Sequence, residues 1–237
     1  LALGMKMEVQ IQEPDVSPLA VQGPKAENLM IRVFGESISR LPFFRFGIFS
    51  FEGRNLVIAR SGYSRQGGFE IYLDQTELGG KLWDTLWEAG EDLEVSPGCP
   101  NLIERVEGGL LSYGNEMTRG NNPLECNLDK FCDLNGSVQY IGRSRLIEIA
   151  EQGVDQRIRG IVFEGSPSPP CGFPWPLESS GQKVGYTTTV VWSPRLKTNL
   201  ALAMVNKAYW ETGDEVRVQL PDGSMREGYV TDLPFSV

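Results

Sequence analysis

The sequence lacks histidine altogether: none occurs among its 237 residues. Histidine is the commonest general base in enzymes and a frequent metal ligand. Its absence excludes Ser-His-Asp and Cys-His hydrolases and every histidine-ligated metal site. Any chemistry must therefore use Asp, Glu, Tyr, Lys or Cys side chains, or the reactivity of a bound cofactor.

Long apolar runs and an excess of positive charge are missing as well. No apolar stretch approaches the ~20 residues that a membrane-spanning helix needs, and the N-terminus has no signal-peptide pattern. The net charge of −9 argues against a nucleic-acid partner, because phosphate backbones attract basic surfaces. These absences predict a cytoplasmic protein with no membrane and no nucleic-acid partner.

Cysteine is scarce, and its spacing follows no known pattern. The chain has four cysteines without a C-x-x-C pair, at Cys99, Cys126, Cys132 and Cys171. This favours free thiols in a reducing compartment. No metal site is expected, because the usual histidine partners of zinc are absent.

The remaining composition is that of an ordinary globular protein with a sizeable core, with 41% hydrophobic and 22% charged residues. The length favours one large domain or two modest ones. The chain opens without methionine, and Leu1-Ala-Leu-Gly4 resembles the last turn of a helix that ends at a glycine. The hypothesis from this edge is a fragment of a longer protein.

The first 153 residues are predicted to alternate strands and helices, which indicates an α+β domain. Alternating or continuous apolar runs predict strands at 7–12, 18–22, 43–51, 55–60, 68–73 and 93–95. Helical spacing and end signals predict helices at 24–35, 74–90, 102–110 and 142–152. The second of these helices is expected to open with a capping box of Asp74 and Glu77. In strand 68–73, Glu70 and Tyr72 are expected to share one face.

Beyond Gly153 the pattern changes to short strands separated by Gly and Pro. Five are predicted, at 158–163, 184–192, 200–205, 216–220 and 228–231, with Pro221-Asp-Gly223 as the turn between the last two. Five short strands without a convincing helix indicate a small barrel or sandwich. The predicted domains are therefore residues 1–153 and 154–237.

Several strings in this order resemble the glycine-cleavage T-protein (aminomethyltransferase) superfamily. The string Ala59-Arg-Ser-Gly-Tyr-Ser-Arg-Gln-Gly-Gly-Phe-Glu-Ile-Tyr72 is similar to the family's R-x-G-Y-T-G-E-x-G-x-E-I pattern. Ile103-Glu-Arg-Val-Glu-Gly-Gly-Leu-Leu-Ser-Tyr-Gly114 resembles its L-R-L-E-A-G-x-x-L-Y-G block. Further matches follow in the family's order: Asn122-Pro-Leu-Glu125, Tyr140-Ile-Gly-Arg143, Ser193-Pro194 and Leu233-Pro-Phe235.

Other strings resemble the dimethylsulfoniopropionate demethylase branch of this superfamily: residues 13–24, 66–68 and 97–105. Asn101 stands where aminomethyltransferases normally carry an Arg, and Arg65 or Gln66 replaces the acidic residue of their G-E-x-G string. Both departures weaken the aminomethyltransferase interpretation. Tyr63 departs from the demethylases, which carry Trp there, so a relative with another methyl donor stays open.

The resemblance implies a T-protein-like folate-binding fold, with an α/β middle domain followed by a small antiparallel β-barrel or jelly-roll-like C-terminal domain. The family architecture is a three-domain cloverleaf with folate in a central funnel. This chain is expected to lack most of the N-terminal domain, which supplies part of the methyl-donor pocket.

The resemblance assigns Glu70 to the pterin of folate. A pterin presents N3–H and a 2-amino group side by side, and a carboxylate accepts such a pair in parallel. Spacing alone favours a solvated strand glutamate, and the resemblance reverses that preference. Tyr63 and Tyr72 flank Glu70. Their rings are expected to stack on the pterin or contact a sulfonium cation, or else to cover the core with their hydroxyls in water.

Three further cofactor-binding candidates follow from the same family comparison. Arg105 is predicted to meet the glutamate tail of folate, or else to pair with Glu107 or a neighbouring strand. Tyr113 belongs to the same motif, with packing as its alternative role. Trp175 is expected on a loop that covers the folate funnel, or else as a loop anchor. No residue is singled out as catalytic.

The functional hypothesis is a tetrahydrofolate-dependent methyltransferase or demethylase. It moves a methyl group from dimethylsulfoniopropionate, or a similar onium donor, to N5 of tetrahydrofolate. Such a donor carries its own leaving group, so displacement needs positioning and desolvation more than a strong acid or base. An aminomethyltransferase of the glycine cleavage system and a folate-binding protein without catalysis stay open. The expected partners are a small-molecule methyl donor and the missing N-terminal segment, and a homodimer is compatible with the sequence.

Overall fold

The structure is a computed structural model that describes residues 8–74, 76–98 and 101–235. The chain divides into two compact units, residues 1–99 and 100–237, and each is described by itself. Among the described residues, no helix is both long and apolar enough to cross a membrane.

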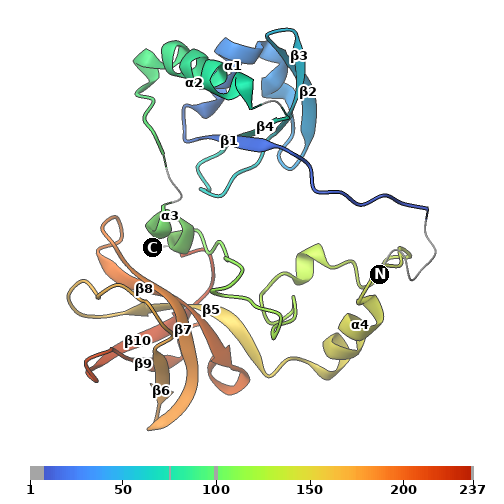
Figure 1. Cartoon of the computed structure of the whole chain (residues 1–237). Coiled ribbons are helices and arrows are strands. Elements are labelled where there is room, and N and C mark those ends of the chain that lie inside the picture. Colours follow the sequence, from blue (N-terminus) through green and yellow to red (C-terminus); the bar gives the residue numbers. More distant parts are fainter. Residues whose placement is uncertain (1–7, 75, 99–100, 236–237) are drawn as a thin grey trace. The chain divides into compact units, whose positions relative to one another are not determined.

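The first unit is a four-stranded antiparallel sheet with helices on one face (Figure 1). Its strands lie in the order β1-β4-β3-β2, with β1 at Ser17–Gln22, β2 at Phe46–Phe51, β3 at Arg54–Ala59 and β4 at Gly68–Leu73. The helices are α1 at Ala26–Phe34 and α2 at Glu77–Ala89, and the 3-10 turns η1 and η2 span Glu36–Arg40 and Glu91–Leu93.

The core of this unit lies between the sheet and its two helices. Alternate residues of β4 are buried, namely Phe69, Ile71 and Leu73, because successive strand side chains point to opposite faces. They pack with Leu29 and Met30 of α1 and with the buried Leu82 and Leu86 of α2. The period of the sequence therefore fixes which sheet face the helices cover.

The second unit contains a closed antiparallel barrel (Figure 1). The strand order is β10-β5-β8-β7-β6-β9, and closure leaves the sheet without free edges. The strands are β5 Gln156–Phe163, β6 Pro176–Ser179, β7 Gln182–Ser193, β8 Thr198–Asn206, β9 Glu215–Gln219 and β10 Met225–Thr231. After β8 the 3-10 turn η4 spans Lys207–Tyr209.

Short helical elements precede the barrel: α3 at Leu102–Glu107, η3 at Asp129–Phe131 and α4 at Arg143–Gln152. Helix α3 packs on the outside of the barrel. Its buried Val106 lies in a cluster with Leu200 and Leu202 of β8 and with Phe235. This contact fixes the motif that begins at α3 against the barrel wall.

The α+β class and the strands and helices that carry the motifs are confirmed. Strands β1 to β4, helices α1, α2 and α4, and the turn at Pro221-Asp-Gly223 lie where the sequence predicts them. The five predicted barrel strands are present, and the sixth, β6, was missed because it is only four residues long and begins at a proline. The domain boundary after residue 153 stays a prediction.

Four local predictions are wrong, each for a physical reason. Residues 8–12 form no strand, because Val9 and Ile11 are 52% and 81% exposed and find no core to pack on; Met7 lies outside the described residues. Residues 93–95 form no strand, because Leu93 is the last residue of η2 and Glu94 takes a left-handed conformation that ends the turn. The capping box does not form, because Thr76 is the N-cap of α2 and makes no side-chain cap bond. The helix predicted through 110 stops at Glu107, where two glycines follow.

Candidate functional site

The first unit leaves one sheet face free of its own helices, and this face carries Glu70. We call it the open sheet face and define it by Phe46 and Ile48 of β2, Val57 of β3, and Glu70 and Tyr72 of β4. Phe46 and Ile48 are 70% and 56% exposed. Clustered exposed apolar side chains of this kind mark binding surfaces on folded proteins.

The strand register surrounds Glu70 with small neighbours. It lies opposite Ala59 of β3 on one side and Ala20 of β1 on the other. Tyr72, two residues along the same face, lies opposite Val57 and Pro18. The two alanines leave room beside the carboxylate, while the aromatic ring of Tyr72 stands next to it.

The carboxylate of Glu70 is half-buried and held by a hydroxyl group. Ser61, just after the end of β3, donates a hydrogen bond from Oγ to Oε2 of Glu70. Among the described residues, Ser61 is the side chain that hydrogen-bonds Glu70. An ionised carboxylate has about four lone-pair sites, so this one retains acceptor capacity for a ligand with two adjacent N–H donors.

Arg60, the first charged residue of the same motif, serves the core side of the sheet. Its guanidinium donates to the carbonyl oxygens of Ser39 and Leu41 at 3.0 and 3.2 Å. It forms an ion pair with Glu27 of α1 and lies 5.4 Å from the ring centre of Phe69. The arginine of the motif therefore ties α1 and η1 to the sheet.

Tyr63 and Tyr72 differ in placement. Tyr72 is half-buried on the open sheet face beside Glu70, as the sequence predicts. Tyr63 lies in the connection between β3 and β4 and is 43% exposed. The ligand contacts expected of both rings stay predictions.

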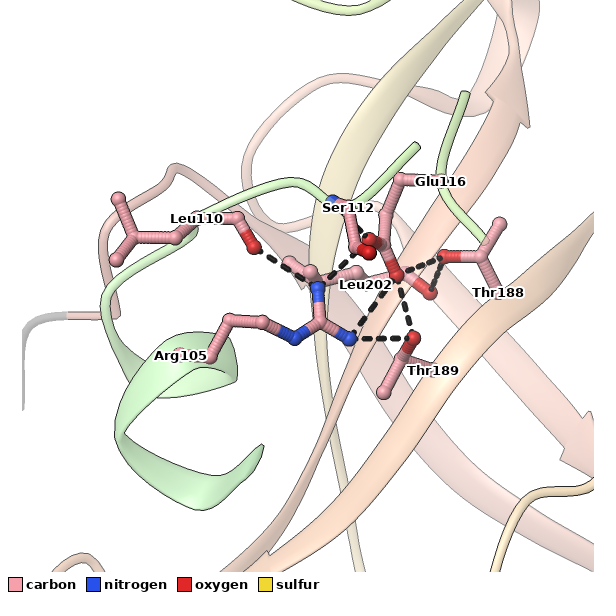
Figure 2. Close-up of polar contacts among 7 residues, drawn as sticks. All are labelled: Arg105, Leu110, Ser112, Glu116, Thr188, Thr189 and Leu202. Atoms are coloured by element: carbon pink, nitrogen blue, oxygen red, sulfur yellow. Dashed lines mark hydrogen bonds and ion pairs between the residues drawn. The ribbon is translucent and has the colours of Figure 1, made fainter. Parts of the chain in front are cut away.

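Arg105 of α3 is buried in an ion pair that the sequence did not indicate (Figure 2). Its Nη1 donates to Oε2 of Glu116 at 2.7 Å and to the carbonyl of Leu110 at 2.9 Å, and its Nη2 donates to Thr189 of β7 at 3.0 Å. Arg105 is 6% and Glu116 2% exposed. The hydrogen bond to Thr189 is the predicted contact with a neighbouring strand, whereas the ion-pair partner is Glu116 and not Glu107. A contact of Arg105 with folate stays a prediction.

Glu116 is the centre of this network (Figure 2). Besides Arg105, it accepts hydrogen bonds from the backbone N–H of Ser112 at 2.7 Å, from Thr188 at 3.2 Å and from Thr189. These donors occupy the acceptor sites of a carboxylate that is closed off from water. The sequence signal for this network is weak: Glu116 is an acidic residue three positions after Tyr113, just outside the motif.

Tyr113 and Trp175 have opposite environments. Tyr113 is 67% exposed, between the network residues Ser112 and Glu116. Trp175 is fully buried in the barrel core, not displayed on a loop surface, and its Nε1 has no hydrogen-bond partner among the described residues. With the exposed Phe173 and the β9–β10 turn it lines a pocket of about 240 Å³.

The described cysteines are free, and two have perturbed thiols. Burial, with smaller contributions from Glu125 and Glu116, raises the pKa of Cys126 to about 11. Burial also raises the pKa of Cys171. A thiol with a raised pKa is a poor nucleophile at neutral pH, so neither fits a catalytic role. Cys99 lies outside the described residues, and no group of metal-ligating side chains occurs among those that are described.

Comparison with known protein families gives two matches that together span most of the chain. The model of the GCVT N-terminal domain matches residues 2–136. The model of the glycine cleavage T-protein C-terminal barrel domain matches residues 156–236, which contain the six barrel strands.

Individual relatives agree with these matches. The dimethylsulfoniopropionate demethylase DmdA of Ruegeria pomeroyi is 50% identical over 233 residues, 97% of this chain and 63% of that protein. An aminomethyltransferase of Caldanaerobacter subterraneus is 33% identical over 217 residues, 90% of this chain and 57% of that protein. The crystal structure of aminomethyltransferase T from Bartonella henselae superposes with a TM-score of 0.69 at 23% identity, covering 93% of this chain and 60% of that one. The chain thus spans about 60% of the length of these relatives.

Proposed function

We propose that this chain, which belongs to the glycine cleavage T-protein family, binds tetrahydrofolate and is part of a one-carbon transferase. The observation that carries this proposal is the carboxylate of Glu70. It stands on the open sheet face between two alanines, held by Ser61, in the string that matches the family motif.

The acceptor carboxylate and the apolar side chains of this face suit a pterin ring. The N3–H and 2-amino groups of a pterin are adjacent donors, and Glu70 retains lone pairs to accept both. The exposed Phe46 and Ile48 and the half-buried Tyr72 offer apolar and aromatic area to the rest of the ring. Tyr63 and the exposed Tyr113 remain further proposed cofactor contacts. Arg105 and Trp175 suit this role less well, because the guanidinium is bound to Glu116 and Thr189 and the indole is buried in the barrel core.

Methyl transfer from dimethylsulfoniopropionate, or from a similar onium donor, is the reaction we favour. When bound, tetrahydrofolate supplies N5 as the methyl acceptor. The chain's own contribution is positioning: Glu70 orients the acceptor, and the apolar side chains of the open sheet face exclude water from the reacting centre. No proton transfer by histidine is needed, in agreement with a sequence that has none.

The identity of the relatives and the position of Asn101 both favour this donor. The 50% identity to a demethylase exceeds the 30–34% identity to seven aminomethyltransferases. Asn101 is the N-cap of α3, and its Oδ1 accepts from the backbone N–H groups of Ile103 and Glu104 at 2.9 and 3.4 Å. By the resemblance given above, aminomethyltransferases are expected to carry an arginine at this position, so a neutral capping residue replaces a cation here.

Aminomethyl transfer is the second candidate, because these relatives cover at least 90% of this chain. The two are separated by incubating the gene product that carries this sequence with tetrahydrofolate and dimethylsulfoniopropionate. We expect 5-methyltetrahydrofolate in amounts that grow with enzyme concentration, measured by liquid chromatography and mass spectrometry.

A parallel reaction with an aminomethylated lipoyl carrier protein is the control. Methylenetetrahydrofolate from the carrier, with no product from the sulfonium donor, would identify an aminomethyltransferase. Folate binding without product from either donor would identify a non-catalytic folate-binding protein.

A further inference from the structure

A single amide side chain joins the two backbone segments that carry Ser61 and Glu70. Gln22, the last residue of β1, donates from Nε2 to the carbonyl of Ser61 at 3.1 Å and to the carbonyl of Phe69 at 3.3 Å. Its Oε1 accepts from the hydroxyl of Ser64 at 2.9 Å. Gln22 therefore uses both ends of its amide to bind the loop after β3, at Ser61 and Ser64, and strand β4, at Phe69.

The packing around this amide is close enough to require glycine. A Cβ at Gly62 would lie 1.9 Å from Oε1 of Gln22, and a Cβ at Gly68 would lie 2.4 Å from the carbonyl oxygen of Val21. Gly68 also has a φ of 149°, which L side chains rarely adopt. The glycines of the motif thus let the loop close onto Gln22.

This arrangement fixes the donor that holds the carboxylate. The carbonyl of Ser61 is bound to Gln22, and the hydroxyl of the same residue donates to Oε2 of Glu70. Glu70 itself follows Phe69, whose carbonyl is the second acceptor of the Gln22 amide. The serine and the glutamate are therefore held in register by one shared side chain.

We infer that Ser61 and Gln22 are positioning residues that orient the Glu70 carboxylate so that it selects a 2-amino-4-oxopteridine ring. The inference rests on the proposed function, because it takes the pterin as the ligand of Glu70. A strand glutamate without these partners samples several rotamers, and a ligand must then bear the entropy of ordering it. The hydrogen bond from Ser61 already orders the Glu70 side chain in the free protein, so ligand binding no longer includes that entropy loss. Preorganisation of this kind increases affinity and selectivity.

The test compares two ring systems that differ at the edge facing Glu70. Pterin-6-carboxylate carries the 2-amino group, whereas lumazine-6-carboxylate carries a 2-oxo group that a carboxylate repels. Isothermal calorimetry on the parent chain should show a clear preference for the pterin. Ser61→Ala should weaken pterin binding about five- to tenfold, the loss expected for one hydrogen bond, and leave lumazine binding unchanged. Ser61→Thr, which keeps the hydroxyl, should restore the preference.

A purely structural role predicts a different pattern. If Ser61→Ala weakens both ligands equally, or keeps the parent's preference, the positioning role is wrong while the proposed function stands. If the parent itself does not prefer the pterin, the proposed function fails, and the inference fails with it.

Gln22→Glu tests the second positioning residue. It removes the Nε2 donor and places a carboxylate against the two backbone carbonyls, so the pterin preference should fall as in Ser61→Ala. Gln152→Glu, at an exposed amide at the end of α4, is the matched control and should bind both rings as the parent does. Circular dichroism of each variant verifies that it is folded. A folded Gln22→Glu variant with the parent's preference would overturn the role of Gln22.

Discussion

Each of the two units places a glutamate, one inside a family motif and one just after such a motif, in a different situation. Glu70 in the first unit is half-buried, and Ser61 is the described side chain that bonds it. Glu116 in the second unit is 2% exposed and accepts from a guanidinium, a backbone amide and two threonine hydroxyls. Arg105, its partner, donates to a backbone carbonyl and a threonine as well.

This difference separates a group available to a ligand from a group used by the fold. A buried charge whose partners are all internal cannot be given to a ligand without leaving an uncompensated opposite charge. A half-buried carboxylate beside two alanines loses little when a ligand arrives, because it still has free lone pairs. Motif membership alone does not distinguish the two cases, whereas burial and the count of internal partners do.

The largest effect is expected where the buried pair is broken. Glu116→Ala leaves the guanidinium of Arg105 buried without its counter-charge. We expect the free energy of unfolding of the second unit to fall by about 3–5 kcal/mol, measured by urea denaturation followed by circular dichroism. The cost arises from desolvation of the remaining charge more than from the lost hydrogen bonds.

Two variants sharpen this result. Glu148→Ala breaks the Arg145–Glu148 pair, whose side chains are 66% and 56% exposed, and should change stability by less than about 0.5 kcal/mol. Arg105→Met combined with Glu116→Leu removes both charges and should recover much of the loss. If Glu116→Ala were as harmless as Glu148→Ala, the contrast between the two units would collapse.

The next effect concerns ligand affinity and not stability. Glu70→Gln replaces one acceptor oxygen with an amide that opposes the pterin's 2-amino group. Hydrogen bonds to charged groups contribute ~1.5–3 kcal/mol, so pterin affinity should fall about 10- to 100-fold. Calorimetry measures the affinity, and urea denaturation should show stability within about 0.5 kcal/mol of the parent.

Glu88→Gln is the matched control, because Glu88 is exposed on α2. It should leave both pterin affinity and stability unchanged. A Glu70→Gln variant that binds the pterin as tightly as Glu88→Gln does would remove Glu70 from the site.

The sequence predicts the elements of the first unit well because their patterns are local. The alternation of Phe69, Ile71 and Leu73 with Glu70 and Tyr72 shows which side chains share a face of β4. Gly90 correctly marks the end of α2. Each of these features depends on residues a few positions apart, which is the range over which propensity and periodicity operate.

The Arg105–Glu116 network and the burial of Trp175 depend on partners far along the chain. Arg105 meets Thr189 across 84 positions, and no periodicity specifies such a pair. Trp175 follows a Pro-rich stretch typical of an exposed loop, yet barrel closure places it in the core with Leu177 and Val218. Local sequence cannot show that a loop residue enters a core made by strands on both sides of it.

The smallest effect tests whether the side chain of Asn101 serves only the fold, as Glu116 does, or is available to a ligand, as Glu70 is. Its side-chain oxygen caps α3, and loss of an N-cap costs about 1 kcal/mol. Asn101→Ala should therefore lower the free energy of unfolding by that amount and leave pterin affinity unchanged. Asn101→Asp retains a capping oxygen and should stay close to the parent in urea denaturation. If Asn101→Ala instead weakened pterin binding while sparing stability, Asn101 would be a ligand-contacting residue. The arginine that the resemblance assigns to this position in aminomethyltransferases would then mark a difference in ligand recognition and not in capping.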